Sequence, residues 1–215
     1  MKKLFTTLFV LGSLFSSDFV EAKDRVRFTV SYNQGRLENK SASEDGDDPH
    51  GESYDGGVFN RVSLGCYNSK KGDLMGVETK GFQYDLVLAF GGTSFTKKSE
   101  AEIIKRSISG AWPAMSYRFK VDDDLSLRTG LGAIPIIQIT HEKAGENHHA
   151  NYSGLEFILG FTFEKLKFPF DVGLNISYGY LKKVGQSDNI VEDVYRLPEE
   201  QSFFSFGVGI TEDIF

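Results

Sequence analysis

Four polar residues whose types could support catalysis lie close together in the second half of the chain. His148 and His149 are followed by Ser153 and Glu156. A histidine near a serine can take the hydroxyl proton and activate the serine oxygen for acyl transfer. Polar residues of an ordinary loop would give the same pattern. We therefore keep His149, Ser153 and Glu156 as a weak catalytic alternative and expect no enzyme activity.

An acidic segment could instead bind a metal ion. Asp45, Asp47 and Asp48 lie beside His50 in a stretch that also contains glycine, serine and glutamate. Carboxylates at this density can hold a hard divalent cation, but the spacing does not match an EF-hand loop. Segments of this composition are typically solvated and disordered. We predict a mobile loop without a cofactor, and weak cation binding by these three aspartates is the alternative.

Seven isolated charges interrupt segments that otherwise alternate between apolar and small polar residues. An ion that is held away from water without a partner is costly, so we expect these charges to pair with one another inside the protein. A structural network of ion pairs is a simpler interpretation than a proton relay or an ion path. The seven residues are Arg27, Arg61, Asp85, Arg118, Arg128, Glu156 and Asp171.

The first 22 residues have the three parts of a secretory signal peptide. Two lysines precede a mainly apolar run, and Val20 and Ala22 supply the small residues of a cleavage site. We expect cleavage after Ala22 and one domain over residues 23–215. The net charge of −6 indicates no nucleic-acid partner. Cys66 is the single cysteine, so the chain can form no internal disulfide.

Period-two alternation recurs eight times after the signal peptide and predicts eight β-strands. Pro113 interrupts the fourth segment and predicts a bulge or a bend. In the fifth segment the alternation puts Ile137 on the apolar face and Gln138 on the polar face. The expected strands cover residues 25–33, 58–67, 74–95, 103–120, 125–140, 153–164, 169–181 and 201–215.

Short and long connections take turns along the chain, and the two longest are Gln34 to Gly57 and Lys182 to Glu200. Outer-membrane barrels have short periplasmic turns and long extracellular loops. The sequence therefore predicts an all-β fold, an eight-stranded antiparallel up-and-down transmembrane β-barrel. An even strand count places both termini on the periplasmic side.

A soluble lipocalin-like barrel, which carries an apolar ligand in the periplasm, has the same alternation with its apolar face turned inward. The polar faces here consist mainly of glycine, serine, threonine and asparagine, which suit a narrow barrel interior better than a solvated surface. Eight strands leave room for little beside side chains, which disfavours a wide pore. Aromatic residues near strand ends fit the girdles at membrane interfaces.

The hairpin that joins the fourth and fifth segments resembles a known family. Ser116 to Phe119, the acidic turn Asp122 to Asp124, and the segment Leu125 to Gly132 resemble the small eight-stranded outer-membrane proteins that include OmpX, Ail and the OmpA barrel. The terminal Phe215 resembles the signal through which the barrel assembly machinery recognises the last strand of such proteins. The resemblance implies a Gram-negative outer membrane, with adhesion, surface interaction or envelope integrity as the role.

Two functions follow as hypotheses. The first is a non-enzymatic barrel in contact with outer-membrane lipid and lipopolysaccharide, whose loops meet an extracellular partner at the cell surface. The second is a lipid A-modifying acyl hydrolase. Outer-membrane lipid A deacylases place a histidine and a serine two positions apart on one strand, whereas His149 and Ser153 are four apart.

Overall fold

The computed structural model describes residues 26–39, 55–68, 72–74, 77–97, 102–143, 146–164, 169–186 and 199–213. The expected signal peptide, the aspartates at positions 45, 47 and 48, and Phe215 lie outside these residues. No helix within the described part of the chain is long and apolar enough to cross a membrane. The strands are β1 (Val26–Asn39), β2 (Asp55–Asn68), β3 (Gly72–Leu74), β4 (Val77–Lys97), β5 (Glu102–Lys120), β6 (Leu125–Lys143), β7 (Glu146–Phe163), β8 (Asp171–Gln186) and β9 (Glu200–Asp213).

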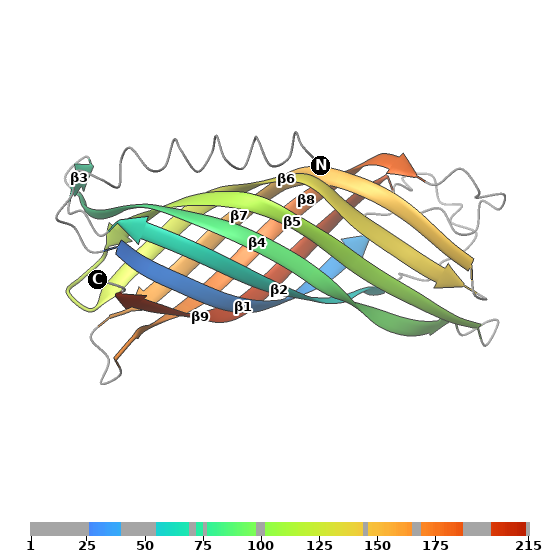
Figure 1. Cartoon of the computed structure of the whole chain (residues 1–215), viewed down its shortest axis with the longest axis horizontal. Coiled ribbons are helices and arrows are strands. Elements are labelled where there is room, and N and C mark those ends of the chain that lie inside the picture. The colour runs from blue at the N-terminus through green and yellow to red at the C-terminus, as the bar shows by residue number, and fades with distance from the viewer. Residues whose placement is uncertain are drawn as a thin grey trace, which may run out of the picture.

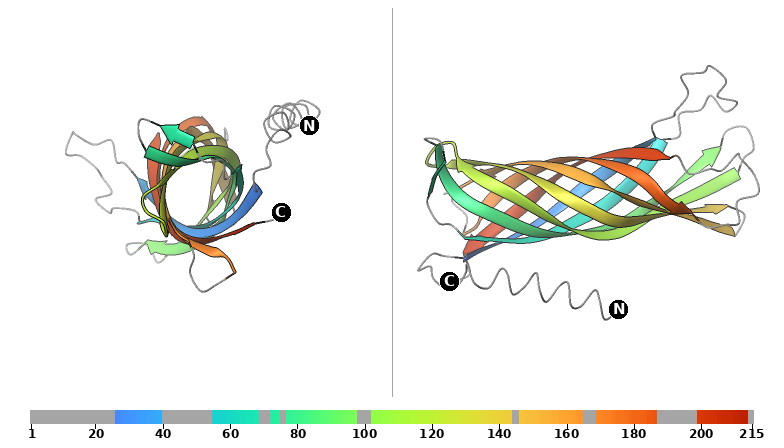
Figure 2. Two further views of the ribbon diagram at one scale, coloured as in Figure 1. Left: turned by 90° about the vertical axis from the view of Figure 1, so that its left-hand side faces the viewer. Right: turned by 90° about the horizontal axis from the view of Figure 1, so that it is seen from above.

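Eight of these strands form a closed antiparallel barrel (Figures 1 and 2). Neighbours in sequence pair with each other from β4 to β9, and β1 pairs with both β2 and β9. Pairing of β2 with β4 completes the ring, so β3 forms only a short hairpin with β4 at its edge. The predicted eight-stranded up-and-down barrel is confirmed.

The two ends of the barrel differ. Arg27 pairs with Asp213, so β1 begins and β9 finishes at the same end, which we call the terminal end. The connection from β5 to β6 lies there too and is tight, because the backbone N–H of Asp124 donates to the Asp122 carboxylate at 2.8 Å. The opposite end, called the loop end, carries the connections β1–β2, β4–β5, β6–β7 and β8–β9.

Several strands extend further toward the loop end than predicted. β1 and β2 pair as far as Glu38 and Asp55, although the sequence pattern suggested a loop from Gln34 to Gly57. β8 likewise continues to Gln186, five residues beyond the predicted end at Leu181. The pairs β4–β5 and β6–β7 extend as well and project at this end (Figure 2). The two longest connections are therefore shortened to residues 40–54 and 187–199.

The outer face of the barrel is apolar over a broad band. On β7, outward positions from 155 to 163 carry Leu155, Phe157, Leu159, Phe161 and Phe163. This span of nine residues matches the 9–11 residues of a tilted membrane-crossing strand. Large apolar side chains that are more than a third exposed occur on all eight barrel strands. The soluble-carrier alternative needs the reverse orientation and is not what the structure shows.

The pattern of polar and apolar residues inverts toward the loop end. Beyond the apolar band, outward positions become polar: Gln138 follows Ile136 on β6, and Ser153 precedes Leu155 on β7. The inward positions become apolar, and this change starts within the apolar band, where Ile158 lies between the outward Phe157 and Leu159. The inward apolar side chains form a cluster, here called the upper core, of Leu37, Phe59, Val87, Ala89, Ile108, Trp112, Ala114, Ile134, Ile137, Ile139, Ala150, Tyr152, Ile158, Leu181 and Phe203.

The inversion corrects part of the predicted alternation. Ile137 is fully buried in the lumen and Gln138 is exposed, so both lie on the faces opposite to those predicted. The cause is a bulge in β6, where Ile134 pairs with Gly154 and the next pair on β7 joins Ile137 to Tyr152. Pro135, which has no backbone N–H, lies in this bulge. No bulge accompanies Pro113 in β5: it pairs with Leu86 within a regular β4–β5 register, and the shift in the β5–β6 register between Gly110 and Ala114 comes from the same extra residue in β6.

Candidate functional site

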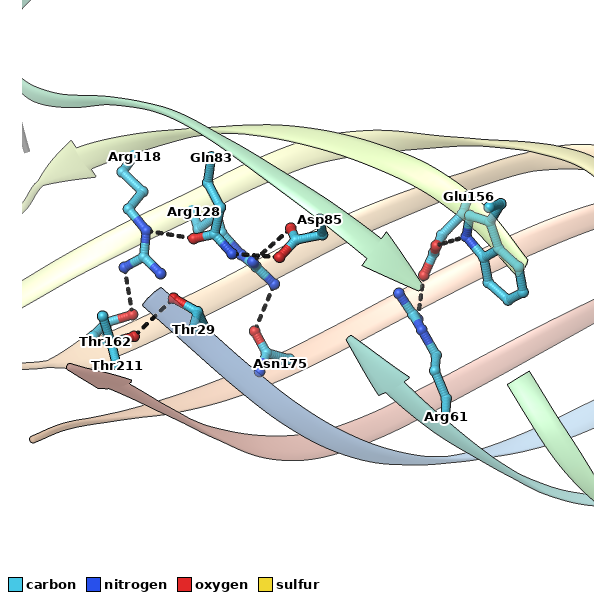
Figure 3. Close-up of polar contacts among 11 residues, drawn as sticks. Thr29, Arg61, Gln83, Asp85, Arg118, Arg128, Glu156, Thr162, Asn175 and Thr211 are labelled. Carbon is cyan, nitrogen blue, oxygen red and sulfur yellow. Dashed lines mark hydrogen bonds and ion pairs between the residues drawn. The ribbon is translucent and has the colours of Figure 1, made fainter. Parts of the chain in front are cut away.

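The lumen between the upper core and the terminal end contains the charged residues singled out in the sequence. Figure 3 labels Arg61, Asp85, Arg118, Arg128 and Glu156 among them. The charged residues come from β1, β2 and β4 to β8 and lie on the inward face of each strand. Polar side chains of Gln83, Thr162 and Asn175 complete their contacts. We call this set the polar interior.

The layer of the polar interior next to the upper core is built around Arg61 and Glu156. Their side chains form an ion pair across the lumen from β2 to β7, with both residues at most 2% exposed. The indole N–H of Trp112 donates to the second carboxylate oxygen of Glu156 at 2.7 Å. Arg61 also donates to Ser177 and Ser205. This layer therefore ties β2, β5, β7, β8 and β9 together.

A second layer centres on Asp85 and Arg128. The Arg128 guanidinium lies 3.1 Å from the Asp85 carboxylate and donates to the Asn175 side-chain oxygen at 2.8 Å. The other oxygen of Asp85 accepts from Gln83 at 2.7 Å. Each of these residues is buried. The carboxylate of Asp85 thus has two separate donors, which lowers the cost of keeping its charge away from water.

Arg118 is held by neutral polar groups and an aromatic ring. Its guanidinium donates to Gln83 and Thr162, each at 2.8 Å, and lies 4.3 Å from the centre of the Tyr67 ring. Hydrogen bonds to neutral oxygens and the face of an aromatic ring both stabilise a cation. Nearer the terminal end, Arg27 pairs with Asp171 at 2.6 Å and donates to the Tyr67 hydroxyl at 3.0 Å.

The structure thus brings the seven charged residues into one interior, where six of them form three ion pairs and Arg118 lies against the Tyr67 ring. Such contacts fix the relative positions of strands that are far apart in the sequence. Removal of one partner from a buried pair is strongly destabilising, because the other charge stays buried alone. The ion pairs therefore stabilise the barrel by joining strands on different sides of the lumen.

The possible catalytic residues are not brought together. Ser153 lies on the outward face of β7, whereas Glu156 points into the lumen and binds Arg61 and Trp112. Four residues of extended strand separate His149 from Ser153 by about 13 Å, well beyond hydrogen-bond reach. The backbone of His148 pairs with His141 on β6. These positions do not form a serine–histidine pair.

Metal-binding side chains show no clustering in the described part of the chain, where no group of three or more histidine, cysteine, aspartate or glutamate side chains is placed to hold an ion. Asp45, Asp47 and Asp48 lie outside that part, so weak cation binding there stays a prediction.

Several residues of the polar interior were not predicted. Gln83, Asn175 and Ser177 lie at polar positions of the alternation, but alternation alone does not say which strands meet across a lumen. Trp112 was missed because Pro113, next to it, interrupts the alternation from which its face would be read. Tyr67 lies at the edge of a predicted strand, where an aromatic residue more often belongs to a membrane-interface girdle.

Comparison by structure finds small outer-membrane barrels. Neisserial surface protein A has a TM-score of 0.54 and 11% sequence identity, over 87% of this chain and 97% of that protein. Ail, the attachment invasion locus protein of Yersinia pestis, has a TM-score of 0.44 and 13% identity over 88% of this chain and 99% of its own. For the outer-membrane enzyme PagL the values are 0.39 and 12%, over 86% and 99%. No family model and no curated protein matches the sequence.

The fold is that of small eight-stranded outer-membrane barrels. Its outer face is apolar over the length of a membrane-crossing strand, and its lumen is filled by paired charges and an apolar cluster.

Proposed function

We propose that this protein is a non-enzymatic barrel of a bacterial outer membrane that presents its loop-end connections to the cell exterior. The observation that supports this proposal most directly is the distribution of side chains. Apolar residues face outward where lipid would be, and the lumen is occupied from the Arg61 layer to Ile139. A barrel built in this way is a scaffold whose variable surface is its loops.

The interior offers little support for a transport or catalytic role. Six of its seven charged groups are paired, and most are less than 9% exposed, so a substrate would have to displace them. The connections at 40–54 and 187–199 are long and polar in sequence. Contact with a partner, a surface or lipopolysaccharide through these segments is the role we infer.

The location and orientation can be tested in one experiment. An epitope inserted at position 46 should be detected by antibody on intact cells, and the same epitope inserted in the turn at Asp123 should be detected only after permeabilisation. Fractionation should recover both variants in the outer membrane, with the heat-modifiable gel mobility of a folded barrel. Recovery in the soluble periplasm, or labelling of the Asp123 insertion on intact cells, would contradict the proposal.

The role of the loops needs a second experiment. Replacement of residues 40–54 and 187–198 by short glycine–serine linkers should abolish attachment of the cells to surfaces, or their resistance to detergent, while the barrel still folds. A matched control shortens only the turn after β7, at residues 165–168. Retention of every phenotype by the double loop replacement would argue against a loop-mediated role.

A further inference from the structure

The ladder between β5 and β6 is interrupted in the part of the apolar band nearest the loop end. Regular pairing stops where Gly110 pairs with Ile137 and resumes where Ala114 pairs with Gly132. This is the longest interruption among the ladders that join the described barrel strands. The unpaired residues of this ladder, which we call the seam, are 111–113 of β5 and 133–136 of β6.

Both strands keep their other neighbour at the seam. Pro113 pairs with Leu86 on β4, and Ala133 pairs with Leu155 on β7. An opening at the seam would therefore separate two intact hairpins, β4–β5 and β6–β7. Pro113 and Pro135 have no backbone N–H, so two of the seven residues of the seam bring no donor that hydrocarbon would leave unsatisfied.

The seam is apolar on its outer and its inner side. The outward positions carry two alanines, two prolines and Ile136, which is 57% exposed. On the inner side, Ile134 and Ile137 are at most 2% exposed and belong to the upper core. An acyl chain that entered between β5 and β6 would therefore meet apolar side chains, and it would expose none of them to water.

One side-chain contact spans the seam from the lumen. Trp112 belongs to the seam, and its side chain is 1% exposed. Its indole N–H donates at 2.7 Å to Glu156 on β7, so the contact passes across the inner face of β6. Gly132 leaves room for this contact, because an added Cβ atom would lie 2.9 Å from the carboxylate and 3.2 Å from the indole. Arg61 binds the other carboxylate oxygen.

We propose that the seam is a lateral opening in the barrel wall, held closed by the hydrogen bond between Trp112 and Glu156, which admits an acyl chain of the surrounding lipid to the upper core. The hydrogen bond joins β5 to β7 and so replaces the pairing that β5 and β6 lack at this level. When it breaks, the two hairpins separate at the seam while the ladders on either side stay paired. This inference concerns the barrel wall and goes beyond the function proposed for the loops.

The fluorescence of Trp112, the single tryptophan, can report the opening. The chain 23–215 is folded into phosphatidylcholine vesicles whose acyl chains carry bromine, which quenches tryptophan on contact. Gly110→Cys and Ile137→Cys, in a Cys66→Ala background, place two thiols at directly paired positions beside the seam. Paired Cα atoms are about 4.5–5.5 Å apart, which suits a disulfide. Oxidation should lower the quenching below that of the reduced form.

The hydrogen bond itself is tested by removal of its acceptor. The double variant Arg61→Leu/Glu156→Leu removes both charges, so neither is left buried alone. Loss of a hydrogen bond to a charged group should raise the open population about tenfold, and the quenching should rise with it. The matched control, Asp85→Leu/Arg128→Leu, removes the neighbouring ion pair and keeps Trp112 bound to Glu156. This control should be quenched as the wild type is.

A further variant leaves all charges in place. Gly132→Ala pushes the indole and the carboxylate apart and should raise the quenching, whereas Gly173→Ala, whose Cβ would have 3.5 Å to the nearest atom, should not. The variant Trp112→Phe/Leu86→Trp puts the tryptophan on the outer face and gives the quenching for full contact with lipid. Heat-modifiable mobility on gels checks that each variant is folded.

Two outcomes would overturn the lateral opening. The first is that oxidation of the cysteine pair leaves the quenching unchanged and that Gly132→Ala is quenched no more than Gly173→Ala. The second is that removal of the Asp85–Arg128 pair raises the quenching as much as removal of the Arg61–Glu156 pair. In that case the loss of any buried ion pair loosens the barrel, and the contact across the seam has no special role.

Discussion

Asp85 occupies the space that a side chain at Gly65 would fill. The two residues are directly paired on β4 and β2, and a Cβ atom added at Gly65 would lie 2.0 Å from a carboxylate oxygen of Asp85. That oxygen accepts from Gln83, and the other one pairs with Arg128. The absence of a side chain at Gly65 is therefore a requirement of the second layer of the polar interior.

Substitution of Gly65 should destabilise the barrel through this layer. We expect Gly65→Ala to lower the free energy of unfolding by about 1–3 kcal/mol, because Asp85 must move from its partners. Gly173→Ala is the control, since its added Cβ would have 3.5 Å to the nearest atom. Urea titration in lipid vesicles, followed by gel mobility, measures both. Equal stability of the two variants would contradict this account.

The pair of Arg61 and Glu156 should show strong coupling. Glu156→Gln leaves the arginine charge buried without its partner and should cost about 3–5 kcal/mol. The double variant Arg61→Met/Glu156→Gln removes both charges and should be more stable than Glu156→Gln alone. Unfolding can be followed by the fluorescence of Trp112, the single tryptophan, which donates to Glu156. Additive effects of the two substitutions would show that the pair is not coupled.

A charged side chain on the outer face should destabilise the folded barrel only at positions that lipid surrounds. Leu86 faces outward on β4 and is 45% exposed. Leu86→Arg should destabilise the folded barrel in vesicles, lowering its free energy of unfolding by about 2–4 kcal/mol, as expected near the middle of a bilayer. Val121→Arg, at the exposed turn of the terminal end, should have little effect. If both variants fold equally well, Leu86 does not face hydrocarbon.

The separation of His149, Ser153 and Glu156 makes a prediction about lipid chemistry. Mass spectra of lipid A from cells with and without the protein should show the same acylation pattern. Cells that carry His149→Ala or Ser153→Ala should also show no difference. A lipid A species with one acyl chain fewer, present only with the wild-type protein, would establish an enzyme and would require a different set of catalytic residues.

The strand order and the faces of most residues could be predicted from alternation. Asp85 and Leu86 are neighbours in sequence, and their opposite faces follow from the period of two residues. The same argument assigned Arg128 and Asp171 to the lumen, and both are buried in the structure. Their partners could not be predicted. Which residues of β4 and β6 face each other across the lumen depends on how the barrel closes, and not on the pattern of any one strand.

Alternation failed where the backbone adds a residue. The bulge at Pro135 and Ile136 changes the phase of β6, so the face predicted for Ile137 is wrong beyond that point. A proline signals that an interruption exists, but it does not say how many residues the interruption takes. Trp112, which donates to Glu156, was missed for another reason: the neighbouring Pro113 suggested an interruption, although β5 keeps its regular pairing with β4 through this position. Alternation also gave no sign of the separate strand β3.

The upper core has a consequence for how the barrel holds its loops. With isoleucines such as Ile137 and Ile139 inside and Gln138 outside, this part of the molecule is packed like a water-soluble globular domain. We expect the part of it that lies beyond the apolar band to stay folded without hydrocarbon around it. The strand ends at the loop end are therefore held by this packing and not by the surrounding lipid. A thinner or more fluid membrane should leave the relative positions of these strand ends unchanged.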